Sequence, residues 1–389
     1  MSKELSPGAA SELAFRIYSI NSNDTVVLNR FLGSKIFAKE MPNKAILEAA
    51  VGGRVINAAR DAFGLCALGA GDYKNDLFLV FRGTTDANNK ADWLTDARIG
   101  ICRSKTGLPV HIGFNHAFNS MLPEIRKFIS QARPTGYIHC IGHSLGGAVA
   151  SLAADWVSKN TLNTAKLYTF GAPRVGTDFF VKSTTSTIRD INMHRTHHRT
   201  DPVPMVALYP FMQAPHSRVG HHYIASNEPL ASGAAHSMIK YSNSMNGKSW
   251  AQLLATPEQP YTVEAAIEQW LKSKTPVDSS SASFWRWVDA ALIYVIKKIS
   301  MGAIYALQGA IIGTMTLADK IAYLLAKGID LAEHISNWVE LLMRKLMQAL
   351  HMKVASTKQE LTQSLIRQVL IRLTEKSNRD ARNAIRSLE

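Results

Sequence analysis

A five-residue segment with glycine at both ends constrains the fold of this chain more than any other feature of its sequence. Residues 142–146 read GHSLG, after the candidate strand Tyr137–Ile141 and at the start of Leu145–Lys159, a helical stretch with small and apolar residues. A serine at a sharp turn from a strand into a helix has a strained backbone, and side chains two positions away on either side would collide. The pattern therefore predicts a buried strand, a tight turn that exposes Ser144, and a helix.

Further strands and helices alternate around this turn. Leu77–Phe81 is a short apolar run between turn-like residues, and Lys166–Phe170 is a second strand candidate. Phe118–Gln131 has the composition of a helix. Short apolar strands that alternate with helices are typical of a mostly parallel sheet covered on both faces, so the sequence predicts an α/β fold.

The composition changes near residue 272. Hydrophobic residues make up 46% of the chain, which favours a packed core, and residues 272–283 read as a linker with one proline and several serines. We expect a catalytic domain over residues 1–274 and an all-helical region over 284–389. Thr357 and Glu360 have the spacing of a capping box, which predicts the start of the last helix there.

One stretch of the helical region is apolar enough to raise the question of a membrane. Ile299–Leu317 contains no charged residue and is nearly long enough to span a bilayer. Its glycines, threonines and Gln308 oppose insertion. We therefore expect a helical hairpin that packs on itself or lies at the membrane interface.

The charge of the chain favours anionic partners. Lys and Arg number 44 against 30 Asp and Glu, a formal net charge of +14. No zinc-finger spacing, RNA-binding strand motif or basic helix with heptads is present, so a negatively charged membrane surface is favoured over nucleic acid. The three cysteines are widely spaced and no metal-ligand spacing occurs. We expect neither a disulfide framework nor a metal or cofactor.

Ser144 is the candidate nucleophile, and a serine hydroxyl needs a base and a group that orients this base. Asp201 lies in a proline-flanked loop after a strand and is the candidate acid. Four histidines follow it: His216, His221, His222 and His236. We favour His236 as the base because it follows a loop, whereas His221 and His222 flank a strand-like segment.

Several segments resemble the class 3 lipases, the fungal-lipase-like branch of the α/β-hydrolases. They occur in the family's order over roughly residues 76–241. The matching segments are Val80–Thr84, Asp92–Asp96, Val110–Phe114, residues 142–146, Thr169–Gly176, Asp201–Pro204, and His236 with Tyr241.

The resemblance implies a fold and a set of site residues. It implies an α/β-hydrolase domain with Ser144, Asp201 and His236 as the catalytic triad. The amide of Leu145 and residue Thr84 would form the oxyanion hole, and Thr85–Ala97 would be a lid that carries Trp93.

The expected function is a lipase or phospholipase that hydrolyses carboxylic esters of glycerolipids through an acyl-serine intermediate. The alternatives are a soluble carboxylesterase and a membrane-active interaction protein in which the hydrolase domain is secondary. The N-terminus lacks the pattern of a Sec signal peptide, so we expect synthesis in the cytoplasm, signal-independent export and action at a membrane. With the appended helices, this resembles bacterial lipase effectors of type VI secretion systems, which implies a secretion-apparatus or immunity protein partner.

Overall fold

The computed structural model describes most of the chain. The described residues are 3–20, 25–39, 46–50, 60–83, 100–216, 219–226, 228, 233–253, 261, 263–275, 277–281, 283–299 and 316–386.

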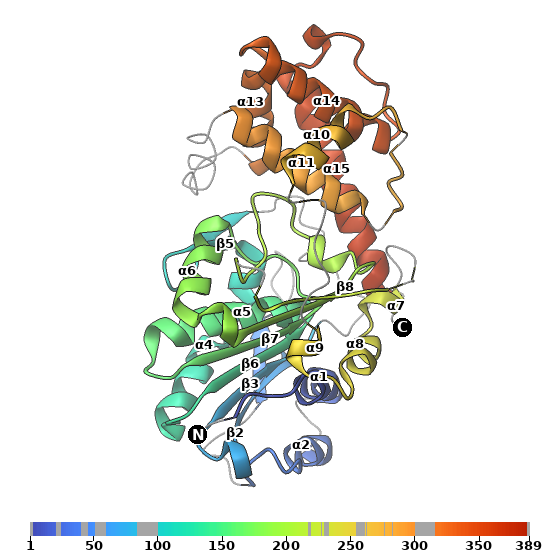
Figure 1. Cartoon of the computed structure of the whole chain (residues 1–389). Coiled ribbons are helices and arrows are strands. Elements are labelled where there is room, and N and C mark those ends of the chain that lie inside the picture. Colours follow the sequence, from blue (N-terminus) through green and yellow to red (C-terminus); the bar gives the residue numbers. More distant parts are fainter. Residues whose placement is uncertain are drawn as a thin grey trace.

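A seven-stranded sheet forms the centre of the larger part of the molecule (Figure 1), in the order β1-β2-β3-β6-β7-β8-β9. Its strands are β1 (Ile46–Ala50), β2 (Arg60–Leu68), β3 (Leu77–Phe81), β6 (Ile138–His143), β7 (Ala165–Phe170), β8 (Met193–His198) and β9 (His221–Ile224). The strands from β3 to β9 are parallel, and β2 pairs antiparallel with both β1 and β3. A separate antiparallel pair is formed by β4 (Ile101–Arg103) and β5 (Pro109–His111). The predicted α/β fold with a mostly parallel sheet is confirmed.

Both faces of the sheet are covered, which explains why its central strands are apolar throughout. In β3, Leu79 and Phe81 point into one core cluster and Phe78 and Val80 into another, and all four side chains are fully buried. Because side chains alternate along a strand, a strand buried on both faces needs an unbroken apolar run.

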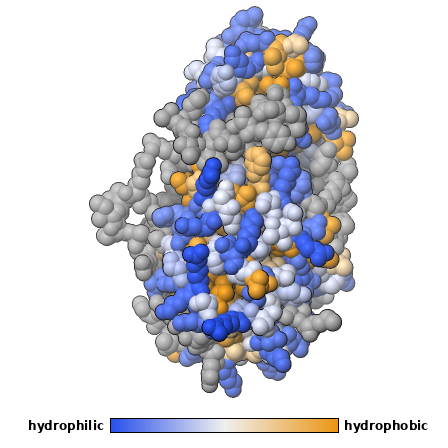
Figure 2. All heavy atoms as spheres, turned by 90° about the vertical axis from the view of Figure 1, so that its left-hand side faces the viewer, coloured by the Kyte–Doolittle hydropathy of each residue, from blue (hydrophilic) through white to orange (hydrophobic). Residues whose placement is uncertain are grey.

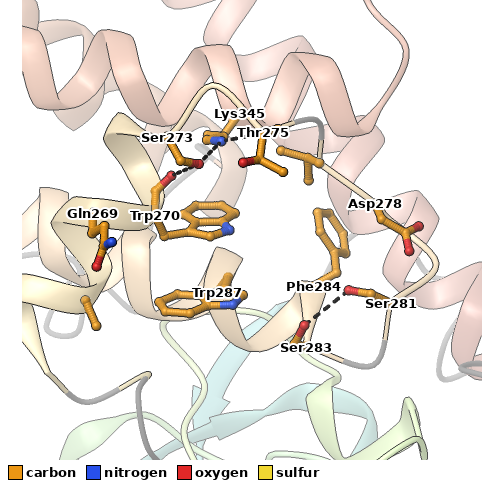
Figure 3. Close-up of a pocket in the computed structure, with 12 residues that line it drawn as sticks. Gln269, Trp270, Ser273, Thr275, Asp278, Ser281, Ser283, Phe284, Trp287 and Lys345 are labelled. Carbon is orange, nitrogen blue, oxygen red and sulfur yellow. Dashed lines mark hydrogen bonds between the residues drawn. The ribbon is translucent and has the colours of Figure 1, made fainter.

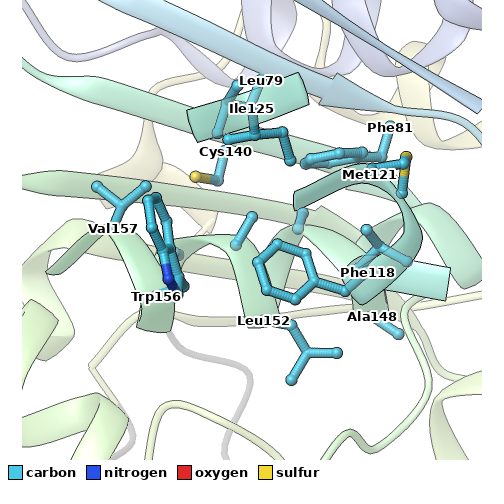
Figure 4. Close-up of a cluster of buried hydrophobic side chains, with 14 of the residues drawn as sticks. Leu79, Phe81, Phe118, Met121, Ile125, Cys140, Ala148, Leu152, Trp156 and Val157 are labelled. Atoms are coloured by element: carbon cyan, nitrogen blue, oxygen red, sulfur yellow. The ribbon is translucent and has the colours of Figure 1, made fainter. Parts of the chain in front are cut away.

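Helices from different parts of the chain cover the two faces. One face is covered by α4 (Ile112–Ala132), α5 (Leu145–Asn160) and α6 (Asp178–Ile188). Figure 4 shows Phe118 of α4 and Leu152 of α5 in one apolar cluster with Leu79 and Cys140 of the strands. The other face is covered by α1 (Pro7–Arg16), α8 (Met238–Met245) and α9 (Trp250–Leu253). The shorter elements of this part are η1 (Ile17–Ser19), α2 (Thr25–Leu32), η2 (Gly71–Tyr73), η3 (Asp190–Asn192), η4 (Val203–Met205) and α7 (Gly233–His236).

The helical region packs above the carboxyl ends of the parallel strands (Figure 1). It consists of α10 (Glu264–Lys272), α11 (Phe284–Ile299), α13 (Leu317–Ile329), α14 (Glu333–Ala349), η5 (Lys358–Glu360) and α15 (Gln363–Arg386). These helices share one apolar core, to which α10 contributes Ile267 and Leu271. The structure thus packs α10 with the later helices, and the proposed division at residues 274–284 stays a prediction.

The helical region also packs against the sheet-containing part. Met205, Leu208 and Tyr209 belong to the same apolar core as the helices. The end of α15 lies beside α7 (Figure 1), where Ala381 and Ile385 join a second apolar cluster. The residues of the sheet-containing part in that cluster are Val203, Val206, Ala207 and Phe211.

The expected capping box at Thr357 is wrong. The last helix begins at Gln363, and the Glu360 carboxylate accepts a hydrogen bond from the backbone N–H of Ser356 at 2.9 Å. Thr357 caps only the 3₁₀ turn η5, without a side-chain hydrogen bond. A complete capping box occurs at Thr316 and Asp319, at the start of α13.

Residues 300–315, most of the apolar stretch at 299–317, lie outside the described residues. Among the helices that are described, none combines the length and the apolar character needed to cross a bilayer.

Candidate active site

Ser144 lies at a sharp turn at the carboxyl edge of the sheet. β6 ends at His143, α5 begins at Leu145, and Ser144 between them has φ 55° and ψ −129°. This backbone conformation is strained for a residue with a side chain. Glycines at 142 and 146 allow the turn to close. A Cβ at Gly142 would collide with the backbone of Gly146, and one at Gly146 with the carbonyl groups at the end of β3.

The structure brings three of the predicted site residues into one hydrogen-bonded chain. His236 Nδ1 lies 2.8 Å from Asp201 Oδ2, and His236 Nε2 lies 2.9 Å from Ser144 Oγ. Since a carboxylate accepts hydrogen bonds, Nδ1 donates to Asp201, and Nε2 of the neutral imidazole accepts from the Ser144 hydroxyl. Asp201 lies in the loop after β8, His236 is the last residue of α7, and Ser144 lies at the turn before α5. Their assignment as a catalytic triad remains a prediction, for which this geometry is the required arrangement.

The Asp201 carboxylate is held by donors on both oxygens. Tyr241 Oη donates to Oδ2 at 2.7 Å, and the backbone N–H of Val203 donates to Oδ1 at 2.9 Å. Burial and the nearby Asp201 charge raise the pKa of Tyr241 well above its usual value, so its hydroxyl keeps its proton. Gly171, with φ 56°, allows the approach. A Cβ there would lie 2.7 Å from Asp201 Oδ2 and 3.1 Å from His236 Nδ1.

The other candidate histidines lie elsewhere. His216 is exposed, and its Nδ1 is 4.0 Å from Asp178. His221 Nε2 donates to the carbonyl oxygen of Pro215 at 2.7 Å. His222 lies 3.1 Å from His194 and packs against Trp250. Of the four histidines, the structure brings His236 alone to Ser144.

The predicted oxyanion and lid residues are only partly described. Leu145 is the first residue of α5, and the first amides of a helix have no acceptor within the helix. This position suits an oxyanion donor, a role that stays a prediction for Leu145. Thr84, Trp93 and the expected lid at 85–97 lie outside the described residues.

Sequence reasoning missed residues that support this site. The sequence predicted no role for Tyr18, Gly83 or Gly171, and it indicated His143 only as part of the turn. Tyr18 has no sequence signal of its own, because it lies about 125 positions before the turn it contacts. Gly171 directly follows β7, and this position at the end of a predicted strand was the available signal.

A cavity of about 480 Å³ lies in the helical region, away from Ser144 (Figure 3). Trp270 and Trp287 stack in its wall with ring centroids 5.7 Å apart. Lys345 donates hydrogen bonds to Ser273 Oγ at 2.9 Å and to the carbonyl oxygen of Thr275 at 3.2 Å. Burial, together with Arg344, lowers the pKa of Lys345. Ser144, Asp201 and His236 do not line this cavity. Within the described residues, no group of three or more His, Cys, Asp or Glu side chains is arranged to hold a metal ion.

Comparison with known proteins agrees with the sequence resemblance. The family model described as "Lipase (class 3)" matches residues 78–211. The secreted mono- and diacylglycerol lipase 1 of Fusarium solani is 35% identical over 136 residues, which are 34% of this chain and 39% of that protein. Residues 78–211 belong to the class 3 lipase family.

Two further relatives extend the comparison. A lipase of Rhizopus niveus is 34% identical to this chain over 145 residues, which are 35% of this chain and 36% of that protein. The solved propeptide complex of Rhizomucor miehei lipase has a TM-score of 0.35 at 27% identity, and the match covers 42% of this chain and 53% of that chain. The chain spans about two-fifths of the length of the curated relatives it matches. Ser144 and Asp201 lie within the class 3 lipase segment, whereas His236 lies beyond it.

Proposed function

We propose that this chain hydrolyses carboxylic ester bonds of glycerolipids through an acyl intermediate on Ser144. The observation that carries the proposal is the hydrogen-bonded chain from Ser144 through His236 to Asp201 at a strained turn. The Fusarium and Penicillium relatives are named as mono- and diacylglycerol lipases, which favours glycerolipid esters as substrates.

The chemistry follows from the positions of the donors and acceptors. His236 Nε2 takes the proton of the Ser144 hydroxyl as Oγ attacks the carbonyl carbon of the ester. The resulting oxyanion would be stabilised by the backbone N–H of Leu145 and, by resemblance, by Thr84. His236 then gives its proton to the leaving alcohol, and a water molecule activated by the same imidazole releases the carboxylic acid. Asp201 keeps Nδ1–H of His236 oriented and stabilises the imidazolium.

We further propose that the substrates include phospholipids and that the chain binds an anionic membrane surface. The formal net charge of +14 supports attraction to anionic headgroups. On the face that carries α4 and α6, Figure 2 shows hydrophobic side chains scattered among hydrophilic ones over the described residues. The route of export and the resemblance to type VI secretion effectors stay predictions.

The decisive test compares the purified chain with its Ser144→Ala variant. The substrates are a monoacylglycerol emulsion, phosphatidylglycerol vesicles and a short soluble ester. We expect the wild type to release fatty acid from a glycerolipid, and the variant to lose activity by about 10⁴-fold or more while keeping its circular dichroism spectrum. Turnover of the soluble ester alone would establish the carboxylesterase alternative. Wild-type activity in a folded Ser144→Ala protein would exclude Ser144 as the nucleophile.

A further inference from the structure

A second hydrogen-bonded chain runs beside the first, and its donors can be assigned without ambiguity. His143 Nε2 lies 2.8 Å from the backbone oxygen of His236, which can only accept, so Nε2 carries the proton. The Nδ1 atom of the neutral ring then accepts from the Tyr18 hydroxyl, 2.6 Å away. Tyr18 Oη in turn accepts from the backbone N–H of Gly83 at 3.0 Å.

Burial maintains this one arrangement of protons. Burial lowers the pKa of His143 well below its usual value, and the charge of His236 acts in the same direction. Burial also raises the pKa of Tyr18. His143 therefore stays neutral and Tyr18 stays protonated at neutral pH. Each group has the protonation state that its neighbours in the chain require.

This second chain joins the segments that carry the proposed catalytic groups. Gly83 is the second residue after the end of β3 and directly precedes Thr84. His143 is the neighbour of Ser144, and the imidazole rings of His143 and His236 are 4.6 Å apart. A Cβ on Gly83 would collide with Tyr18 Oη and lie 3.0 Å from the Cβ of Ser144. Tyr18, from η1 near the N-terminus, thus touches the strand end and the turn at once.

The position of His236 depends on such support. It is the last residue of α7, a helix of four residues that cannot be stable by itself. Its bond to Ser144 requires that its ring stay within a few tenths of an ångström of its place, because small displacements cost large factors in rate. Its backbone carbonyl is held by His143, one peptide bond away from the nucleophile. Base and nucleophile are thereby fixed to each other through the protein as well as through their own hydrogen bond.

We propose that Tyr18 and His143 are positioning residues, which hold the end of β3, the Ser144 turn and the His236 backbone in one catalytic geometry. The inference rests on the proposed function, because it assigns these residues a part in the work of the same site. They act through Gly83 and His236 and need not touch the substrate.

The test removes the hydroxyl of Tyr18 and the imidazole nitrogens of His143 separately and together. Tyr18→Phe and His143→Phe keep ring packing but break the chain. We expect each to lower kcat on a soluble ester by about 10- to 100-fold, with KM within about 2-fold of wild type. The double variant should lose no more than the worse single variant, since either change breaks the same chain. His143→Gln, whose amide can still donate to the His236 carbonyl, should recover part of the loss. Tyr323→Phe, at an exposed tyrosine of α13, is the matched control.

Two further measurements separate positioning from general destabilisation and from failure of the proposed function. The thermal midpoint of each variant shows whether it is folded, and the rate at which a fluorophosphonate labels Ser144 reports on the nucleophile without ester turnover. Slower labelling of folded Tyr18→Phe supports the inference even if the wild type hydrolyses no tested ester, a result that defeats only the proposed function. A folded Tyr18→Phe with wild-type kcat and labelling rate overturns the inference. Strictly additive losses in the double variant also overturn it. A wild-type chain that neither hydrolyses ester nor reacts with the label defeats both proposals.

Discussion

At the scale of single residues, the geometry of the site depends on positions where no side chain stands between the proposed catalytic groups. Gly171 has no side chain where a Cβ would lie 2.7 Å from Asp201 Oδ2. The Tyr241 hydroxyl donates a hydrogen bond to Asp201 and accepts one from the backbone N–H of His198 at 3.0 Å. These hydrogen bonds fix the orientation of the Asp201 carboxylate, which in turn orients the His236 ring through Nδ1.

The histidines offer the sharpest test at this scale. We expect His236→Ala to lose ester hydrolysis by a factor similar to that for Ser144→Ala, because base and nucleophile act as a unit. His221→Ala should keep most of the activity, because the His221 side chain bonds the Pro215 carbonyl rather than the site. Initial rates on a soluble ester for both purified variants provide the measurement. An active His236→Ala protein would show that another residue is the base.

At the scale of elements, several buried histidines lie in and around the sheet. His194, His197 and His198 all lie on β8, and each is buried. His111 begins α4 by accepting the backbone N–H of Gly113 at 3.2 Å, and its ring stacks on Phe114 at 4.3 Å. Burial lowers the pKa of His111 to about 4. Burial in these elements stabilises the neutral imidazole relative to the charged imidazolium.

This arrangement predicts a loss of stability in acid. Because the pKa of His111 is lower in the folded chain than its usual 6.5, the unfolded chain binds more protons between these values. The contribution of the neutral His111 side chain to the free energy of unfolding is complete above about pH 6.5 and decreases as the pH falls towards 4. From pH 7 to pH 5, His111 alone should lower the free energy of unfolding by about 2 kcal/mol.

His111→Asn keeps a side chain that can cap α4 but cannot titrate. Urea unfolding of both proteins at pH 7 and pH 5 measures the difference. The variant should lose about 2 kcal/mol less than the wild type on acidification. An equal loss in both proteins would show that His111 is not the source.

At the scale of the whole molecule, the helical region supports the site directly. α15 packs on η4, which follows Asp201, and on α7, which carries His236. Trp285 Nε1 donates to Asp380 at 3.2 Å and anchors α15 to α11. Arg174, on the sheet-containing part, pairs with Asp289 of α11 at 2.7 Å. The two parts therefore share apolar clusters and the Arg174–Asp289 ion pair, and we expect their stabilities to depend on each other.

A single charge placed in this junction should reveal the dependence. Ala381 is fully buried on α15 against the loop after Asp201. We expect Ala381→Asp to lower the free energy of unfolding by roughly 3 kcal/mol or more, because it buries an unpaired charge. Hydrolysis of a soluble ester should fall with it. Asn383→Asp, two positions away and exposed, adds the same charge as a control. Full activity in Ala381→Asp would instead make the sheet-containing part independent of α15.

The sequence by itself determined the local features of this protein. The glycines at 142 and 146 and the apolar runs on both sides of them predicted the strand, the turn and the helix, and β3 was predicted with its bounds at Leu77 and Phe81. These features depend on backbone conformation and on the period of apolar residues, which neighbouring positions encode. The capping box expected at Thr357 failed because its spacing recurs in loops as well as at helix starts.

Only the tertiary structure decided which distant residues meet. Four histidines followed Asp201, and packing of α7 brought His236 to a turn 92 positions earlier. Tyr18 reached the same turn from 125 positions away, and α15 returned from the C-terminal region to cover η4 and α7. Such contacts form when all the apolar faces of the chain are buried together, so no local pattern specifies them. For this chain, the sequence predicts the nucleophile, and the packing of the whole molecule selects and supports its partners.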